Sequence, residues 1–74
     1  MNNLQEVNFL HENRLAKGLT QKQVSVSADI TESFYCLIEN GQRRPSVAVA
    51  KRIADVLGFD WTMFFSDSEQ GGHL

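Results

Sequence analysis

Residues 20–41 read TQKQVSVSADITESFYCLIENG and predict two short helices separated by a tight turn. Thr20 and Gln23 have the spacing of a capping box, in which two side chains bond reciprocally to backbone N–H groups at a helix start. The helical pattern that follows stops at Ala28, and Thr31 provides a second N-cap shortly afterwards. The two helices are therefore joined by only a few residues.

A helix end and a basic loop follow this pair of helices. Asn40-Gly41 offers residues that enter the left-handed backbone region, which predicts a helix C-terminus and makes the helix from Thr31 about two turns long. The next residues include Arg43, Arg44 and the lone proline, Pro45. Two short helices, a tight turn and a basic loop are the layout of a helix-turn-helix, whose second helix enters the DNA major groove.

The segments on either side predict three further helices. Asn3 and Glu6 suggest a capping box for a helix that continues to Lys17 and stops at Gly18. Beyond the basic loop, Ser46 is the N-cap of a helix with one apolar stripe, formed by Val49, Ala50, Ile53, Ala54 and Leu57.

Asp60 then caps a last short helix that carries Trp61, Met63, Phe64 and Phe65. This cluster exceeds what a short helix needs for its own packing, so we expect a homodimer interface formed by Trp61, Phe64 and Phe65. The alternative is that all four side chains close the base of the bundle. No strand pattern or repeat occurs, and the sequence predicts an all-α, compact five-helix bundle.

Length and composition agree with one small globular domain. The chain has 74 residues, which excludes a multidomain enzyme, and 42% of them are hydrophobic. We expect the domain to span residues 1–66 and residues 67–74 to form a polar, disordered tail. The apolar runs are too short to cross a membrane, and a signal-peptide pattern is missing, which favours a cytoplasmic location.

No group of residues predicts catalysis, a cofactor or a metal. Cys36 is the single cysteine and has no Lys or Arg within three residues, which favours a packed, inert thiol over a redox sensor. His11 and His73 lack the cysteine or carboxylate cluster of a metal site. We expect a protein that is not an enzyme.

Charge is distributed unevenly along the chain. Seven Lys and Arg residues against nine Asp and Glu residues give a formal net charge of −2, so any nucleic-acid contact must come from a local patch. Residues 40–52 contain Arg43, Arg44, Lys51 and Arg52 without an acidic residue. Residues 53–74 contain four acidic residues and no Lys or Arg. One part of an acidic protein is therefore basic.

Several separated motifs resemble the Cro/CI-type (XRE) helix-turn-helix regulators of phages and bacteria. They are Gly18-Leu19-Thr20-Gln21, Ile38-Glu39-Asn40-Gly41, Arg43, Pro45-Ser46 and Ile53-Ala54-Asp55-Val56-Leu57-Gly58. The resemblance runs without a gap from about Leu10 to Phe65. It implies a five-helix bundle that binds double-stranded DNA as a symmetric homodimer and regulates transcription as a repressor.

The resemblance also implies roles for individual residues. Base edges are read by Glu32, Ser33 and Leu37. DNA phosphates are held by Gln21, Lys22, Asn40, Arg43 and Arg44. Arg14 and Glu39 match a pair that links the first and third helices within the fold.

The sequence departs from the family pattern in three respects. The base-reading positions lack the Arg, Gln or Lys that relatives often have, and the helix from Thr31 contains no Lys or Arg. Asp29 stands where the turn commonly has glycine, and Asn13 occupies a usually apolar position. The acidic reading helix leaves open an alternative function: a helix-turn-helix protein-binding module, an antirepressor or adaptor with little DNA affinity.

Overall fold

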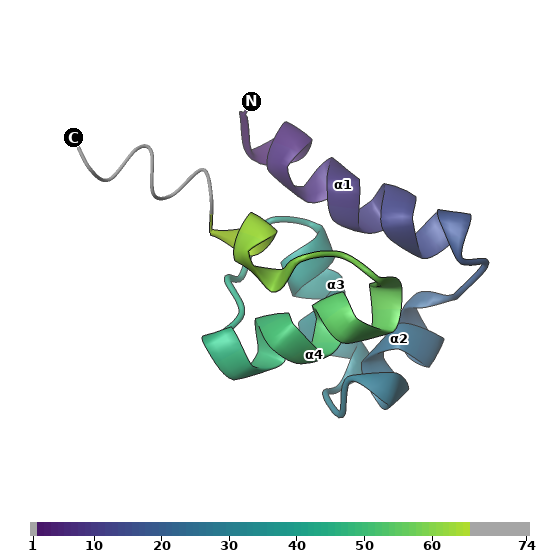
Figure 1. The fold of residues 1–74 in the computed structure, drawn as a ribbon. Helices are drawn as coiled ribbons and strands as arrows, with labels where there is room; N and C mark the ends of the chain where they lie inside the picture. Colours follow the sequence, from purple (N-terminus) through teal and green to yellow (C-terminus); the bar gives the residue numbers. More distant parts are fainter. Residues whose placement is uncertain (1, 66–74) are drawn as a thin grey trace.

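The computed structural model describes residues 2–65, with side chains from Phe9 onward. Four α-helices follow one another, and a short 3₁₀ helix comes last (Figure 1): α1 (Asn2–Ala16), α2 (Gln21–Ser27), α3 (Glu32–Glu39), α4 (Val47–Leu57) and η1 (Trp61–Phe64). The described part of the chain contains no strand, which confirms the predicted all-α fold. The fifth expected helix is a single 3₁₀ turn. The predicted tail lies outside the described residues.

The turn between α2 and α3 forms as the sequence predicts. The Thr20 hydroxyl accepts from the Gln23 backbone N–H, and the Gln23 side chain accepts from the Thr20 N–H, which completes the capping box. Thr31 caps α3 by accepting from the Phe34 N–H. Asp29 adopts φ 62°, the left-handed conformation that short polar side chains tolerate better than most. The aspartate therefore replaces the usual turn glycine.

Two helix ends differ from the sequence prediction. α1 begins at Asn2, so Asn3 lies inside the helix and not at its N-cap. At the end of α3, only Gly41 is left-handed, with φ 81°, because Asn40 keeps a right-handed helical conformation. The helical backbone conformation therefore extends through the C-cap Asn40, and the left-handed turn comes at Gly41.

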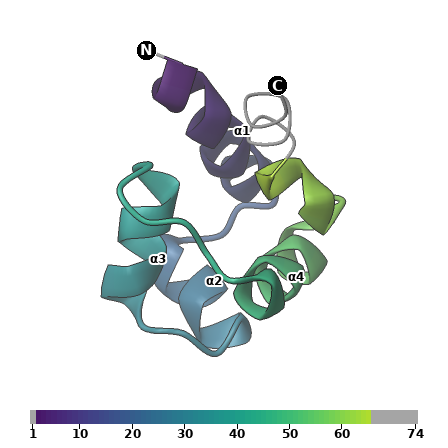
Figure 2. The same ribbon diagram turned by 90° about the vertical axis from the view of Figure 1, so that its left-hand side faces the viewer.

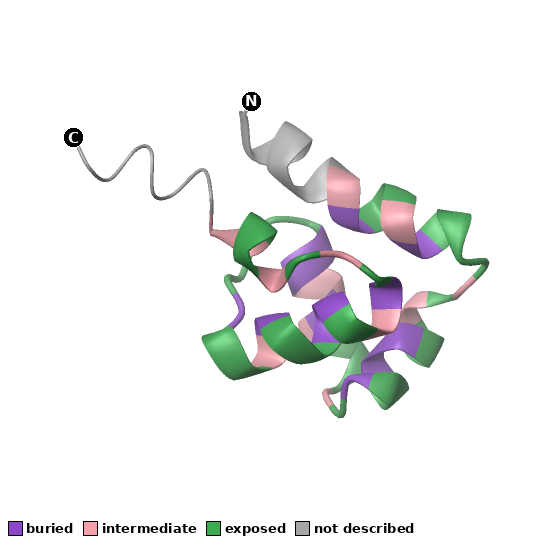
Figure 3. Cartoon of the chain, viewed as in Figure 1, coloured by how far each residue is buried: buried purple, intermediate pink, exposed green. Residues whose placement is uncertain are grey.

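The core lies where the inner faces of the four α-helices meet (Figure 3). Leu10, Val24, Tyr35 and Ile53 are all buried in it, one from each helix. The apolar stripe of α4 faces inward as predicted, although Val49 at its edge is only half-buried. Turning the molecule by 90° shows α3 and α4 on opposite sides with α2 between them (Figure 2). Among the described residues, no helix is both long and apolar enough to cross a membrane.

Candidate nucleic-acid interface

The residues exposed on the outer face of α3 follow from those buried on its inner face. Tyr35 and Ile38 are buried against the core, as expected for this helix. Glu32 and Ser33 in the first turn are therefore exposed, and Leu37, one turn after Ser33, is half-buried. The three residues implied to read bases thus all have surface available at one side of α3.

The residues implied to hold phosphates lie at the start of α2 and after the end of α3. Lys22, Asn40, Arg43 and Arg44 are exposed, whereas Gln21 is half-buried. The two segments belong to neighbouring helices that share many contacts, so both lie beside α3. Polar and cationic groups from both segments therefore lie near α3.

Arg43 is held in place from two directions. Its backbone N–H donates to the carbonyl of Leu37 at 3.2 Å, which folds the loop back onto α3. Its guanidinium carbon lies 5.8 Å from the centre of the Phe34 ring, within the range of a cation–π contact. The cation is therefore kept against α3.

A buried ion pair joins α1 to α3 behind this surface. Arg14 donates from Nε to Glu39 Oε1 and from Nη2 to Glu39 Oε2, both at 3.0 Å. A third donor, Arg14 Nη1, reaches the carbonyl of Leu19 at 3.0 Å in the connection to α2. One guanidinium on α1 thus contacts both the last residue of α3 and the connection that leads to α2.

Glu39 has two further partners that the sequence did not reveal. His11 Nδ1 lies 2.7 Å from Oε2, and Gln21 Nε2 donates to Oε1 at 3.3 Å. Burial favours the neutral carboxyl group, but the hydrogen bonds from Arg14 and His11 outweigh it, and the pKa of Glu39 lies below its ordinary value. Glu39 therefore remains a carboxylate at neutral pH.

The hydroxyl of Tyr35 is buried beside this pair, without a hydrogen bond among the described residues. Burial raises the pKa of Tyr35, and the neighbouring charge of Glu39 raises it further. The phenol is therefore neutral at neutral pH, where Glu39 is charged.

Sequence reasoning also missed Arg52. Its Nε donates to the carbonyl of Ala28 at 2.7 Å, so α4 holds the C-terminal end of α2 at the turn. Arg52 was counted only as part of the basic stretch. His11 is exposed, and its contact with Glu39 is a feature that the sequence did not indicate.

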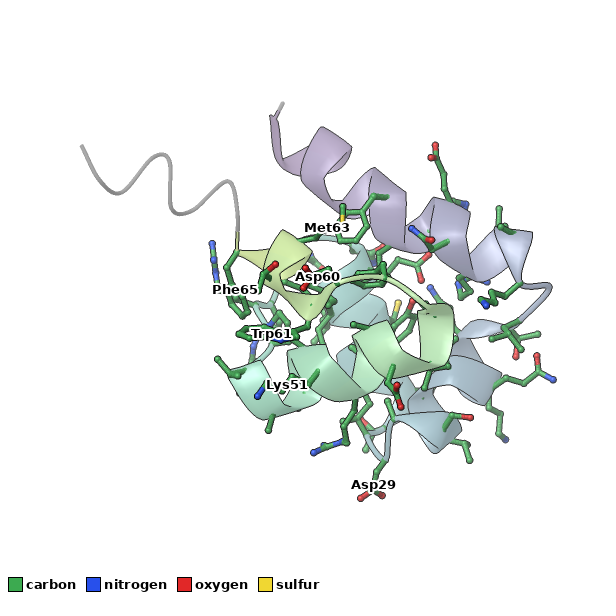
Figure 4. The ribbon with its side chains drawn as sticks, viewed as in Figure 1. Asp29, Lys51, Asp60, Trp61, Met63 and Phe65 are labelled. Atoms are coloured by element: carbon green, nitrogen blue, oxygen red, sulfur yellow. The ribbon has the colours of Figure 1, made fainter. Side chains whose placement is uncertain are left out.

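The aromatic residues near η1 form one connected cluster, in which the rings of Phe64 and Phe65 lie 6.3 Å apart between centroids. The ring of Phe64 lies 5.9 Å from Phe9 and 5.6 Å from Phe59, measured between centroids, so it packs inside the protomer. Trp61 instead contacts Phe65 at 6.0 Å, and Lys51 points toward the Trp61 ring at 5.1 Å (Figure 4).

Of the expected interface residues, Phe64 therefore also closes the base of the bundle. Met63 on the same short helix is 46% exposed.

Three other residues singled out in the sequence lie on α3, in the turn between α2 and α3, and on α1. Cys36 is half-buried on α3 and accepts from the Asn40 side chain at 3.6 Å. Asp29 points away from the bundle at the tip of the turn (Figure 4). Asn13 is half-buried and donates to the Phe9 carbonyl at 2.7 Å, so its amide is satisfied inside α1. The described residues include no group of three or more side chains suited to a metal ion, and His73 lies outside them.

Comparison with known proteins agrees with this geometry. A family model described as helix-turn-helix matches residues 10–64, which is more than half of the chain. The chain is 54% identical over 59 residues to an uncharacterized HTH-type transcriptional regulator, YqaF, of Bacillus subtilis (strain 168); the match covers 80% of this chain and 78% of that protein. No solved structure gives a significant match.

Proposed function

Because this chain belongs to the XRE-type helix-turn-helix regulators, we propose that it binds a palindromic operator as a homodimer and represses transcription in the cytoplasm. The observation that carries the proposal is the exposed face of α3 beside Arg43. Tyr35 and Ile38 lock the inner face of the helix into the core, while Glu32 and Ser33 remain exposed. A rigid helix with one free face and a neighbouring cation suits the major groove.

Phosphate contacts would supply most of the affinity. Arg43 and Arg44 are exposed after α3, and Lys22 is exposed on α2, so cations flank the reading helix. Gln21 and Asn40 add neutral donors, which fix the register of the protein on the duplex without reading sequence. The negative net charge of the chain does not oppose this, because the cations are gathered near α3.

Base contacts would come from Glu32, Ser33 and Leu37. A carboxylate can only accept hydrogen bonds, so Glu32 is suited to the amino group of cytosine or adenine. Leu37 is half-buried on the same helix and offers a methyl surface to a thymine methyl group. A glutamate near phosphates repels them, so Glu32 contributes selectivity and lowers affinity.

The homodimer would be built at the η1 end of the protomer. A single domain contacts one half-site, whereas two domains related by a two-fold axis reach half-sites about 34 Å apart and double the contacts. Trp61 and Phe65 contact each other and are each half-buried, with Met63 exposed nearby. These side chains form the apolar surface offered to a second copy.

One observation favours a different function. α3 carries no cation, and its exposed carboxylate, Glu32, weakens any attraction to DNA, whereas Glu39 is buried and paired with Arg14. A protein-binding module that acts as an antirepressor or adaptor is the alternative. Its binding partner would be another protein rather than a nucleic acid.

Fluorescence anisotropy with a labelled duplex distinguishes the two functions. If the dimer neutralises about four to six phosphates, the logarithm of the binding constant falls against the logarithm of salt concentration with a slope of about −4 to −5. A duplex containing an inverted repeat from the DNA next to the gene is expected to bind more tightly than a scrambled duplex. Absence of binding at low salt would contradict the proposal and favour the protein-binding module.

A further inference from the structure

We propose that Glu39 is a positioning residue for the phosphate contact of Gln21. Gln21 Nε2 donates to Glu39 Oε1 at 3.3 Å, a bond that runs from α2 to the last residue of α3. The proposal rests on the DNA-binding function proposed above and specifies how one of its contacts is prepared in the free protein. The Glu39 carboxylate turns the Gln21 amide so that one N–H faces inward and the other is presented to DNA.

The carboxylate is fixed independently of Gln21. Arg14 contacts both of its oxygens at 3.0 Å, and His11 Nδ1 lies 2.7 Å from Oε2. The exposed fraction of Glu39 is 5%, so the surrounding atoms also restrict its rotation. Gln21 therefore meets an acceptor whose position is already determined by α1.

The backbone that leads to Gln21 is fixed by the same guanidinium. Arg14 Nη1 donates to the carbonyl of Leu19 at 3.0 Å, and the Thr20 capping box begins α2 immediately afterwards. Both the start of α2 and the acceptor for its first side chain are thus set relative to Arg14. This double anchoring leaves the Gln21 amide little freedom of position.

The chemistry of the two groups decides which way the amide faces. An ionised carboxylate only accepts hydrogen bonds, so the Gln21 carbonyl oxygen cannot face Glu39 and the NH₂ group must. An amide nitrogen carries two N–H groups, and the bond to Glu39 uses one. A phosphate oxygen is also an acceptor and suits the second. Ordering the side chain before binding avoids an immobilisation cost equivalent to about two- to ten-fold in affinity.

NMR relaxation of side-chain amides tests the geometry in the free, unmodified protein. The Gln21 side chain is expected to be nearly as rigid as the backbone, with an order parameter of about 0.8. Gln42, which is exposed in the loop after α3, serves as the control and is expected below about 0.6. Equal mobility of the two side chains would overturn the proposal. This test needs no variant, so its result does not depend on whether a variant folds.

A double-mutant cycle tests the functional part with a labelled duplex of about 24 base pairs, long enough for two half-sites. Gln21→Ala is expected to weaken binding about two- to ten-fold. Glu39→Gln is expected to weaken it in the wild-type background and to change it less than about two-fold in the Gln21→Ala background. Ile53→Val, which alters the buried face of α4, controls for lost stability and is expected to leave affinity unchanged.

The outcomes separate this inference from the proposed function. Equal effects of Glu39→Gln in both backgrounds, or a matching loss with Ile53→Val, would overturn the positioning role while DNA binding stands. A wild-type protein that binds DNA without any contribution from Gln21 would do the same. A wild-type protein that binds no duplex at low salt would overturn both.

Discussion

Arg14 donates to both carboxylate oxygens of Glu39, from Nε to Oε1 and from Nη2 to Oε2, at 3.0 Å each. The pair is buried and joins α1 to the last residue of the reading helix. Glu39 also accepts a hydrogen bond from the Gln21 side chain on α2. Three helices therefore depend on one ion pair for their relative positions. Its integrity therefore affects both the stability of the fold and the surface presented to DNA.

Replacing Arg14 with alanine is expected to destabilise the protein strongly. Removing one partner of a buried ion pair typically costs about 3–5 kcal/mol, because the other charge is left without compensation. The lower end applies here, since His11 and Gln21 still reach Glu39. Urea unfolding followed by circular dichroism measures the loss, with the exposed Lys22→Ala as control. A midpoint for Arg14→Ala equal to wild type would refute the buried pair.

Stability is expected to fall at acidic pH because of Glu39. The pKa of this carboxyl lies below its ordinary value of 4.5, so its contribution is complete above that value. The contribution is lost as pH falls through the lowered pKa of the folded state. Urea unfolding at a series of pH values measures this, and Glu39→Gln is expected to flatten the profile.

Asp55→Asn changes an exposed carboxylate on α4 and controls for the removal of an acidic group. This variant is expected to keep the acid dependence of wild type. If Asp55→Asn flattened the profile and Glu39→Gln did not, the assignment of the acid transition to Glu39 would be wrong.

Much of the fold follows from local sequence rules, as the turn between α2 and α3 illustrates. Thr20, Gln23 and Thr31 cap helices through bonds to residues three positions away, so their partners are fixed by spacing alone. The length of η1 was less predictable, because four residues after an N-cap are compatible with either an α-helical or a 3₁₀ turn.

The contacts across the bundle were harder to foresee. His11 meets Glu39 over 28 positions of sequence, and Arg52 meets Ala28 over 24. Such contacts depend on how helices pack, and spacing along one helix carries no information about them. The Arg14–Glu39 pair was anticipated only through the family resemblance, for the same reason. Roles in DNA binding stay predictions, since exposure of Glu32 or Arg43 indicates availability and not use.

Arg43→Ala is expected to weaken DNA binding and reduce its salt dependence. Each phosphate neutralised contributes about −0.9 to the slope, so a symmetric dimer that loses two cations has a slope less negative by about 1.8. Salt titrations of anisotropy measure the slope. Lys17→Ala is the matched control, because it also removes one cation. The Lys17 ammonium lies beside Gly58 at the end of α4, not in the loop after α3. An unchanged slope for Arg43→Ala would remove Arg43 from the phosphate contacts.

Sedimentation at micromolar concentration is expected to give twice the monomer mass. Phe65→Ala and Phe64→Ala are both expected to shift the protein toward monomer. Phe64 also packs against Phe9 and Phe59, so its substitution destabilises the fold as well, whereas Phe65→Ala tests the interface more selectively. Leu15→Ala alters an exposed apolar residue of α1 and is the control. A strict monomer at high concentration would exclude the dimer.

The most direct test of DNA reading by α3 is selection from a pool of random duplexes, carried out in parallel with wild type and Glu32→Ala. The account predicts that wild type enriches an inverted repeat in which one base pair per half-site offers an amino group, with cytosine preferred. Glu32→Ala is expected to lose about 1–3 kcal/mol of discrimination at that pair alone, while binding to unrelated DNA stays level or rises. Enrichment of no site by wild type, or a uniform gain in affinity for all sequences with Glu32→Ala, would contradict it.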